Sequence, residues 1–258
     1  MLKPSFLSRL QTLSLKRQSS LCVGLDPDFE RLPERVPKTI SGMTSFLLDV
    51  ISATSDCCIA YKPNIAFFEA MGIEGLEMLL KVRQAIPSDI PVIADGKRGD
   101  IGNTSRMQAK FLYEYFGFDA VTLHPYMGSD SLIPFFEYKD KFNFVLGLTS
   151  NPGAKDFEYL ELKSGVPLYR EVIRRCVEWD AEFHNVGLVV GGTQDGLSAV
   201  RECAENLLFL MPGIGYQGGD YQHSVRLGKN ADGLVLVNVG RDIMYASSIE
   251  DAVSKLFR

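Results

Sequence analysis

The sequence predicts a (β/α)8 barrel, or TIM barrel, formed by residues 1–258 as a single domain with an additional N-terminal helix. Short runs rich in Val, Ile and Leu recur along the chain and show little polar alternation, as expected for parallel strands that are buried on both faces. Longer segments with helical spacing separate these runs, which is the pattern of βαβ units. Eight units in about 250 residues match a (β/α)8 barrel, and an open doubly wound sheet is the alternative.

Eight apolar runs are the expected strands. In chain order they are Leu21–Asp26, Cys58–Lys62, Val92–Lys97, Ala120–His124, Phe144–Ser150, Val186–Gly191, Leu207–Met211 and Leu234–Val239. The helical spacing between them predicts helices that include Thr44–Ile51, Gly75–Ala85, Ser105–Phe116, Leu168–Phe183, Leu197–Ala204 and Ile243–Leu256. Because no linker or low-complexity segment interrupts the alternation, we expect one domain.

The N-terminal segment, residues 1–20, precedes the first expected strand. It holds four basic residues, five serines and no acidic residue, a composition that resembles a transit peptide. The apolar residues Phe6, Leu7, Leu10 and Leu13 recur at helical spacing, which favours an amphipathic helix with these residues on one face. Because the first strand begins directly after this segment, we expect the helix.

The overall composition is that of an ordinary globular protein. Of the 258 residues, 46% are hydrophobic and 23% are charged, and the net charge is −5. An acidic balance argues against a general nucleic-acid or acidic-membrane binder, which usually shows a basic excess. No apolar run approaches the roughly 18 residues that span a bilayer. Five cysteines without a framework spacing are expected to be free thiols, which predicts a cytoplasmic protein.

Charged side chains gather at the ends of the expected strands, although a sheet core should reject charge. Five of the eight strand ends carry such residues, namely Asp26, Lys62, Asp95 with Lys97, His124 and Arg241. Active sites of (β/α)8 barrels lie where the strands end and the following loops begin. The asymmetry therefore favours an enzyme over a purely structural barrel.

The densest charged group is the segment 95–100, with the sequence Asp-Gly-Lys-Arg-Gly-Asp. In a strand, residues i and i+2 point to the same face, so Asp95 and Lys97 are expected to project together into the barrel mouth. With Lys62 from the neighbouring strand and Asp100, they form an alternating array of lysines and carboxylates. A lysine between carboxylates has a raised pKa, which suits it to donate a proton rather than to act as a nucleophile. The alternative is a structural ion-pair network, or an Asp100 that only caps the next helix.

Glycine is unevenly distributed, because 11 of the 23 glycines lie between positions 187 and 240. Residues 211–220 follow the seventh strand and residues 239–242 follow the eighth, and these two loops of a barrel often bind phosphate. Backbone N–H groups of Gly213, Gly215, Gly218, Gly219 and Gly240 are the expected anion contacts, supplemented by Gln217 and Arg241. The alternative is tight turns without a ligand. A dinucleotide site is disfavoured, because the G-x-G-x-x-G pattern here follows the seventh strand rather than the first.

Two further candidates are weaker. Asp26 is placed to bind sugar hydroxyls, and Ser150 to hydrogen-bond a polar heterocycle, although both are also ordinary turn residues. The segment 151–165 is long for a loop of this kind and is a candidate lid. The three histidines are dispersed, and His124 is expected to be structural, so no metal-ligand spacing appears. The sequence is also compatible with a Mg2+ ion bound by carboxylates.

These residues together resemble the orotidine 5′-phosphate decarboxylase family over the whole chain. The segments that carry the resemblance are 22–26 (Cys-Val-Gly-Leu-Asp), 61–64 (Tyr-Lys-Pro-Asn), 95–104, 150–153 (Ser-Asn-Pro-Gly), 212–220 and 239–241 (Val-Gly-Arg). The combination of Asp-x-Lys-x-x-Asp-Ile with the glycine-rich loop after the seventh strand is specific. The ending Gly102-Asn103-Thr104 is similar to the bacterial second subgroup of the family.

The resemblance implies the activity: decarboxylation of orotidine 5′-monophosphate to uridine 5′-monophosphate (UMP) and CO2 without a cofactor, the last step of de novo pyrimidine nucleotide synthesis. It implies that Lys97 protonates C6 of the pyrimidine as CO2 leaves, while Asp95 faces the substrate carboxylate and orients Lys97. Lys62 and Asp26 are implied to contact the ribose.

The resemblance further implies a homodimer with its active sites at the subunit interface. Asp100 and Thr104 are implied to reach the ribose region of the partner subunit's site, and the adjoining Ile101 is implied to bind substrate. Around the substrate it implies pyrimidine contact by Ser150, phosphate binding by Gln217 and Arg241, and positions beside the ligand for Pro212 and Gly240.

Two other functions stay in view. One is another phosphate-binding barrel lyase that acts on a keto-sugar phosphate with Mg2+ at Asp95 and Lys97. The other is a non-catalytic nucleotide sensor. The charged array argues against the sensor, because a sensor needs no buried lysine between acids. The segments that resemble the decarboxylase family along the full chain argue against the Mg2+-dependent lyase. Since no pyridoxal phosphate or thiamine site is evident, we expect electrostatic stabilisation by residues already in place.

Overall fold

The computed structural model describes residues 4–191, 196–213 and 220–257. Its eight strands are β1 (Leu21–Leu25), β2 (Ala60–Pro63), β3 (Ile93–Arg98), β4 (Ala120–Leu123), β5 (Phe142–Leu148), β6 (Val186–Val190), β7 (Phe209–Met211) and β8 (Leu236–Val239). Each begins and ends within two residues of an expected strand. The predicted ends Asp26, His124 and Ser150 fall just beyond the strands, in the loops that follow them.

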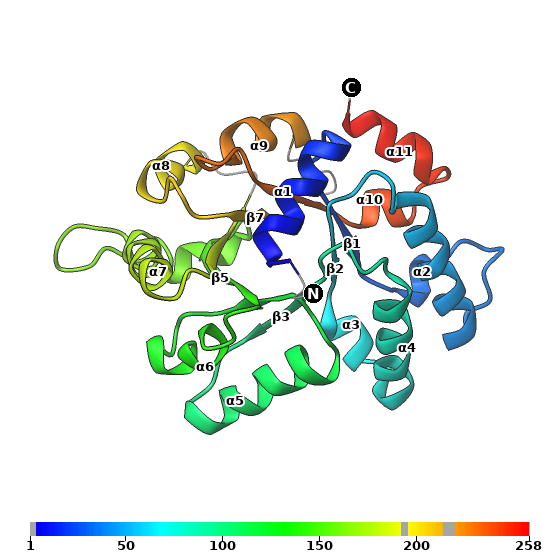
Figure 1. Cartoon of the computed structure of the whole chain (residues 1–258), viewed down its shortest axis with the longest axis horizontal. Helices are drawn as coiled ribbons and strands as arrows, with labels where there is room; N and C mark the ends of the chain where they lie inside the picture. Colours follow the sequence, from blue (N-terminus) through cyan, green and yellow to red (C-terminus); the bar gives the residue numbers. More distant parts are fainter. Residues whose placement is uncertain (1–3, 192–195, 214–219, 258) are drawn as a thin grey trace.

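The strands form one parallel barrel (Figure 1). Their hydrogen-bonded order is β2-β1-β8-β7-β6-β5-β4-β3, so the first and last strands in this order are β2 and β3. Two parallel bridges, Tyr61 with Val92 and Asn64 with Asp95, connect β2 to β3 and bring the sheet round on itself. The predicted (β/α)8 barrel is confirmed, and the open doubly wound sheet is wrong.

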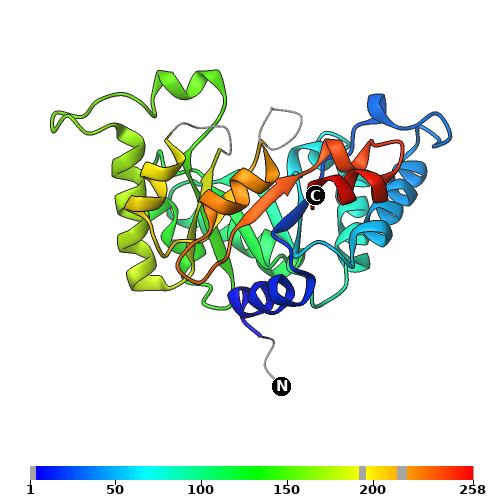
Figure 2. The ribbon, with the colours of Figure 1, turned by 90° about the horizontal axis from the view of Figure 1, so that it is seen from above.

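Helices surround the barrel (Figures 1 and 2). They are α1 (Phe6–Arg17), α2 (Ile40–Thr54), α3 (Ile65–Glu69), α4 (Gly72–Ala85), α5 (Gly102–Lys110), α6 (Ile133–Phe136), α7 (Leu168–Phe183), α8 (Leu197–Cys203), α9 (Tyr221–Gly228), α10 (Arg241–Met244) and α11 (Ile249–Leu256). A π-helical turn over Phe111–Tyr115 continues α5. The sequence pattern predicts the longer helices well. The expected helices do not include α3, α6 or α9, and of these α3 and α6 are too brief to show a helical period.

The C-terminal region corrects one expectation. Instead of one helix over Ile243–Leu256, α10 and α11 are separated by four residues. Ser248 ends the break by capping α11, because its side chain accepts a hydrogen bond from the N–H of Asp251. Within the break, the Tyr245 hydroxyl donates to the carbonyl of Asp26 and accepts from the N–H of Asp28. The interruption therefore ties the loop after β8 to the loop after β1.

Helix α1 covers the end of the barrel at which the strands begin (Figure 2). Phe6, Leu10 and Leu13 are buried, and the Phe6 ring stacks on Phe142 of β5 with centroids 5.0 Å apart. The predicted N-terminal helix is confirmed. One part of the prediction is wrong, because Leu7 is 37% exposed and does not share the buried face.

A buried ionic cluster fastens α1 to this closed end. The carboxylate of Asp119, just before β4, accepts from Arg9 Nη2 at 2.5 Å and lies 3.4 Å from Arg83 Nη2 of α4. It also accepts the N–H of Val92 at 2.9 Å, at the start of β3. One buried acid thus joins α1, α4 and the beginnings of two strands.

Two whole-chain properties bear on the sequence-based expectations. In the described part of the chain, no helix is long and apolar enough to cross a membrane. All five cysteines are free, and Cys22, Cys58 and Cys176 are buried. Burial raises the pKa of the Cys58 thiol to about 12, so this cysteine is inert as a nucleophile.

Candidate active site

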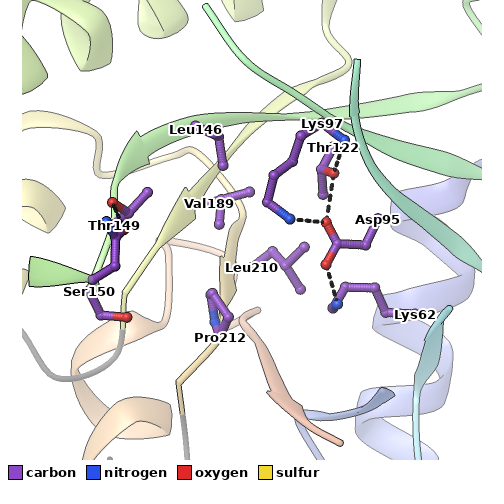
Figure 3. A pocket seen from close by; sticks show the side chains of 11 residues that line it. Lys62, Asp95, Lys97, Thr122, Leu146, Thr149, Ser150, Val189, Leu210 and Pro212 are labelled. Atoms are coloured by element: carbon purple, nitrogen blue, oxygen red, sulfur yellow. Dashed lines mark hydrogen bonds and ion pairs between the residues drawn. The ribbon is translucent and has the colours of Figure 1, made fainter. Parts of the chain in front are cut away.

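A cavity of about 230 Å3 opens at the ends of the barrel strands (Figure 3). One wall is charged and polar, and is formed by Lys62, Asp95, Lys97 and Thr122. The facing wall is apolar, with Leu146, Val189, Leu210 and Pro212. Thr149, Ser150 and Asn151, which follow β5, complete the lining. The cavity therefore sets ammonium groups against an apolar surface, an environment that strengthens electrostatic interactions.

Asp95 is the centre of the charged wall. Its Oδ2 lies 2.5 Å from Nζ of Lys62, and its Oδ1 lies 2.6 Å from Nζ of Lys97. Lys62 is 5% exposed at the side chain, whereas Lys97 is 50% exposed and reaches into the cavity. Closure of the barrel between β2 and β3 brings the two strands together. The expected array of Lys62, Asp95 and Lys97 is present.

The backbone of β3 explains how Lys97 reaches the cavity, and the reason differs from simple alternation. Between matched pairs with β4, β3 advances four residues, from Ala94 to Arg98, while β4 advances two, from Val121 to Leu123. Within this bulge Lys97 has φ +44°, in the left-handed region that costs a non-glycine residue about 1–2 kcal/mol. Asp95 and Lys97 therefore face the same cavity through a bulge.

The electrostatics of the array keep Asp95 and Lys62 ionised at neutral pH. Burial alone raises the pKa of Asp95, but the ammonium groups of Lys62 and Lys97 outweigh it and hold this pKa well below its ordinary value. Burial alone lowers the pKa of Lys62, but the carboxylates of Asp95 and Asp26 outweigh it and hold this pKa above its ordinary value. The site therefore presents fixed ammonium groups without any rearrangement of charge.

Asp26 lies beside the array without joining it by a direct ion pair among the described residues. Burial raises its pKa, while Lys62 pulls it down. Its Oδ1 is buried and has no hydrogen-bond partner within the described protein. A buried carboxylate oxygen without a partner is costly, and such atoms occur where a ligand completes the hydrogen bonding.

Asp100, Ile101 and Thr104 lie on the loop after β3 and on the start of α5, away from the cavity lining. The Asp100 carboxylate accepts the N–H of Ile101 at 2.7 Å, and the Asp100 N–H donates to Ser105 Oγ at 3.0 Å. Asp100 is not among the residues that line the cavity of this chain, so its place in the lysine–carboxylate array stays a prediction. Ile101 is 61% exposed, and Thr104 is also exposed.

Ser150 and Pro212 line the cavity, as expected of substrate-binding residues. The loop after β5 is anchored by Glu158, whose carboxylate accepts the Thr149 N–H at 2.7 Å and the Thr149 hydroxyl at 2.6 Å. Gly191 packs against Ser150 so closely that a Cβ on it would lie 2.8 Å from Ser150 Cβ. The candidate lid, residues 151–165, thus carries the anchor that fixes the edge of the cavity.

The expected phosphate-binding loops are described in part. Gln217, Gly215, Gly218 and Gly219 lie outside the described residues. Gly240 and Arg241 begin α10, and a Cβ on Gly24 of β1 would lie 2.9 Å from Gly240 Cα. This close approach sets Arg241 near Asp26, where its charge partly opposes the rise in the Asp26 pKa that burial causes. Gly213 has φ +92°, a conformation that favours glycine.

Sequence reasoning missed three polar residues of the cavity lining, Thr122, Thr149 and Asn151, and of these Thr122 contacts the charged array. Its hydroxyl donates to Asp95 Oδ1 at 2.9 Å and accepts the Lys97 N–H at 3.0 Å. Threonine is common in strands, so Thr122 does not stand out in an apolar strand, whereas the charged candidate His124 does. The available signal is its position near the C-terminal end of β4, one residue before Leu123, because active sites of this fold lie at the strand ends. His124 is not in the cavity lining.

The barrel and the charged array at its strand ends define a (β/α)8-barrel enzyme. Comparison with known proteins then gives the family. The chain belongs to the Orotidine 5'-phosphate decarboxylase / HUMPS family, whose model matches residues 19–256.

Relatives and solved structures agree with this assignment. The chain is 44% identical over 247 residues to the orotidine 5'-phosphate decarboxylase of Thermomicrobium roseum, a match that covers 95% of this chain and 88% of that protein. It is similar to the structure of Leishmania donovani OMP decarboxylase with a TM-score of 0.88 and 39% identity, over 98% of this chain and 96% of that one. It also matches Leishmania donovani UMP synthase (TM-score 0.90, 41% identity), covering 98% of this chain and 55% of that one, so it spans about half of that protein's length.

Proposed function

We propose that the protein decarboxylates orotidine 5′-monophosphate to UMP and CO2 without a cofactor, as the last step of de novo pyrimidine nucleotide synthesis. The observation that carries the proposal is the array of Lys62, Asp95 and Lys97 at the mouth of a barrel whose family is named for this reaction. The names of the relatives at 39–44% identity support the same substrate.

The chemistry of the reaction matches the array. Loss of CO2 leaves negative charge at C6 of the pyrimidine, with no adjacent carbonyl to delocalise it. An ammonium group already in place stabilises that charge without reorganisation. Lys97 is half exposed to the cavity and is the proton donor in this proposal, while the buried Lys62 keeps Asp95 ionised and fixed. The bond between C6 and the carboxylate carbon breaks, and the proton from Lys97 forms the new bond at C6.

The rest of the substrate is assigned to residues around the array. Ser150 and Pro212 are proposed to contact the pyrimidine, and their positions in the cavity wall support this. Asp26 is proposed to bind ribose hydroxyls, which would supply partners for its unpaired Oδ1. Gly240 and Arg241 at the start of α10 are proposed to bind the phosphate together with Gln217. Binding energy from the distant phosphate can then orient the reacting ring.

We also propose a homodimer in which Asp100, Ile101 and Thr104 reach the substrate of the partner subunit. These residues lie outside the cavity of their own chain, at the N-terminal end of a helix with exposed apolar side chains. Met107 is 54% exposed and Tyr115 is 66% exposed, on α5 and the turn that continues it. Large exposed apolar surface of this kind marks interaction sites.

The remaining proposals concern organisation and location. Pairing of β1 with β8 joins the two ends of the chain in one barrel, which supports a single domain over residues 1–258. Five free cysteines, three of them buried, support a reducing compartment, and we propose the cytoplasm.

A Mg2+-dependent lyase is less well supported by the array. Both oxygens of Asp95 are already engaged by ammonium groups at 2.5 and 2.6 Å, and these cations repel a divalent ion. In the chain as described, no group of three or more His, Cys, Asp or Glu side chains could hold a metal.

The test is an absorbance assay with purified protein and orotidine 5′-monophosphate, run with and without EDTA. We expect loss of substrate absorbance and formation of UMP at the same rate in both. No turnover, or turnover abolished by EDTA, contradicts the proposal. Protein with Lys97→Ala, purified in parallel, controls for a contaminating enzyme from the expression host.

A further inference from the structure

We propose that Thr122 is a positioning residue for the reaction, because its buried hydroxyl fixes both the Asp95 carboxylate and the backbone of Lys97. This inference rests on the proposed decarboxylase function. Thr122 is 1% exposed and belongs to β4, whereas Asp95 and Lys97 belong to β3. From the neighbouring strand, the hydroxyl thus connects the Asp95 carboxylate to the backbone of Lys97 (Figure 3).

The direction of the two hydrogen bonds is fixed by chemistry. The backbone N–H of Lys97 can only donate, so Thr122 Oγ1 accepts it at 3.0 Å. The single hydroxyl proton is then available for Asp95 Oδ1 at 2.9 Å. The same Oδ1 receives the Lys97 ammonium at 2.6 Å. One hydroxyl is therefore hydrogen-bonded both to the Asp95 carboxylate and to the backbone of Lys97, whose side chain carries the catalytic ammonium group.

The bulge in β3 makes this contact necessary. The left-handed backbone of Lys97 sits between the matched pairs of β3 and β4, so its N–H lies outside the regular strand pairing there. Thr122 provides the partner for that N–H. A buried backbone donor without a partner is strongly disfavoured, so removing the hydroxyl favours a shift of the Lys97 backbone.

The hydrogen bond from Thr122 to Asp95 matters most for catalysis once Lys97 has transferred its proton. When Lys97 passes its proton to C6, the neutral amine attracts Asp95 less strongly. Lys62 on Oδ2 and Thr122 on Oδ1 are then the contacts that keep the carboxylate oriented. We therefore expect Thr122 to act on kcat more than on binding of the nucleotide.

The test compares Thr122→Val with Thr122→Ser. Valine keeps the branched shape and removes the hydroxyl, and serine keeps the hydroxyl. We expect Thr122→Val to lower kcat about 10- to 100-fold, as small misplacements of catalytic groups do, with the Kd of UMP changed by less than about threefold. Thr122→Ser is expected to keep kcat within about threefold of the wild type.

Thr54→Val is the matched control. Thr54 is fully buried on α2 and donates to the carbonyl of Val50, with its hydroxyl 2.7 Å from that of Tyr61. Its loss removes buried hydrogen bonds away from the cavity, and we expect kcat to stay at the wild-type value. If Thr122→Val does not give folded protein, Thr122→Ala takes its place in the same comparison.

Three results would overturn the inference: normal kcat in Thr122→Val, equal loss in Thr122→Ser, or equal loss in Thr54→Val. A wild-type protein that forms no UMP overturns the proposed function, and the inference falls with it. Wild-type turnover with an unimpaired Thr122→Val overturns the inference alone.

Discussion

Replacing Asp119 by Asn at the closed end of the barrel should destabilise the fold and leave the chemistry intact. The carboxylate is 3% exposed and is held by Arg9 Nη2 at 2.5 Å, with Arg83 Nη2 at 3.4 Å and the Val92 N–H at 2.9 Å. Asparagine has nearly the same shape and can still accept the N–H of Val92. It cannot neutralise the two guanidinium groups, which then face each other without a counter-ion.

The size of the effect follows from burial. Removing one partner of a buried ion pair typically costs about 3–5 kcal/mol, because an uncompensated charge stays in the interior. For a chain of this size about 2–4 °C in Tm accompanies each kcal/mol, so we expect Tm to fall by about 6–20 °C. The KM for the substrate should not change, since Asp119 directly precedes β4, whereas the cavity lies at the ends of the strands.

Thermal and urea unfolding followed by circular dichroism measure the loss. Asp89→Asn is the control, because Asp89 is 62% exposed and its atoms lie 3.9 Å from Arg17. A long pair with an exposed carboxylate contributes about 0–1 kcal/mol. If Asp119→Asn unfolds within about 1 kcal/mol of the wild type, the cluster does not fasten α1 as the structure indicates.

Four further changes test the site. Lys97→Ala should lower kcat by more than about 10^3-fold while UMP still binds, and near-normal kcat would remove Lys97 from its role. Arg241→Ala should weaken UMP binding by about 10- to 100-fold but leave uridine binding unchanged, and equal effects on both ligands would contradict the phosphate assignment. Glu158→Gln should raise KM about tenfold by loosening Thr149, and an unchanged KM would show that the anchor is dispensable. The depressed pKa of Asp95 means that its stabilisation is present above the unfolded-state value of about 3.9 and is lost as pH falls through and below it. The unfolding free-energy difference between wild type and Asp95→Asn should therefore be constant from pH 5 to 8 and shrink below about pH 4, and a change between pH 6 and 8 would contradict this.

The fold and the centre of the site could be predicted because both leave local signals. Buried parallel strands give continuous apolar runs, and charges at their ends stand out against that background. Asp95 and Lys97 were therefore predictable as a pair. The sequence did not predict why the two side chains face the same cavity, because the bulge in β3 and the left-handed backbone of Lys97 depend on pairing with β4.

Other parts of the site leave no local signal. Thr122, Leu146 and Val189 have the composition of ordinary strands, and only closure of the barrel turns them toward the cavity. Asp100 is a different case. Its spacing suggests a fourth member of the array, but it follows β3 in a loop, where its carboxylate accepts the N–H of Ile101, and its place in the array stays a prediction. Sequence spacing predicts the direction of side chains within a strand. It does not predict their direction in the loop that follows the strand.

The most direct test of the central claim is a reaction in D2O containing EDTA, with UMP and CO2 quantified and the UMP examined by NMR. Protons on Nζ of Lys97 exchange with solvent, so the account predicts one CO2 per UMP and deuterium at C6 of the product. Lys97→Ala should form no UMP on the same timescale. Absence of UMP, or equal rates with and without the lysine, would contradict decarboxylation by the Lys62, Asp95 and Lys97 array.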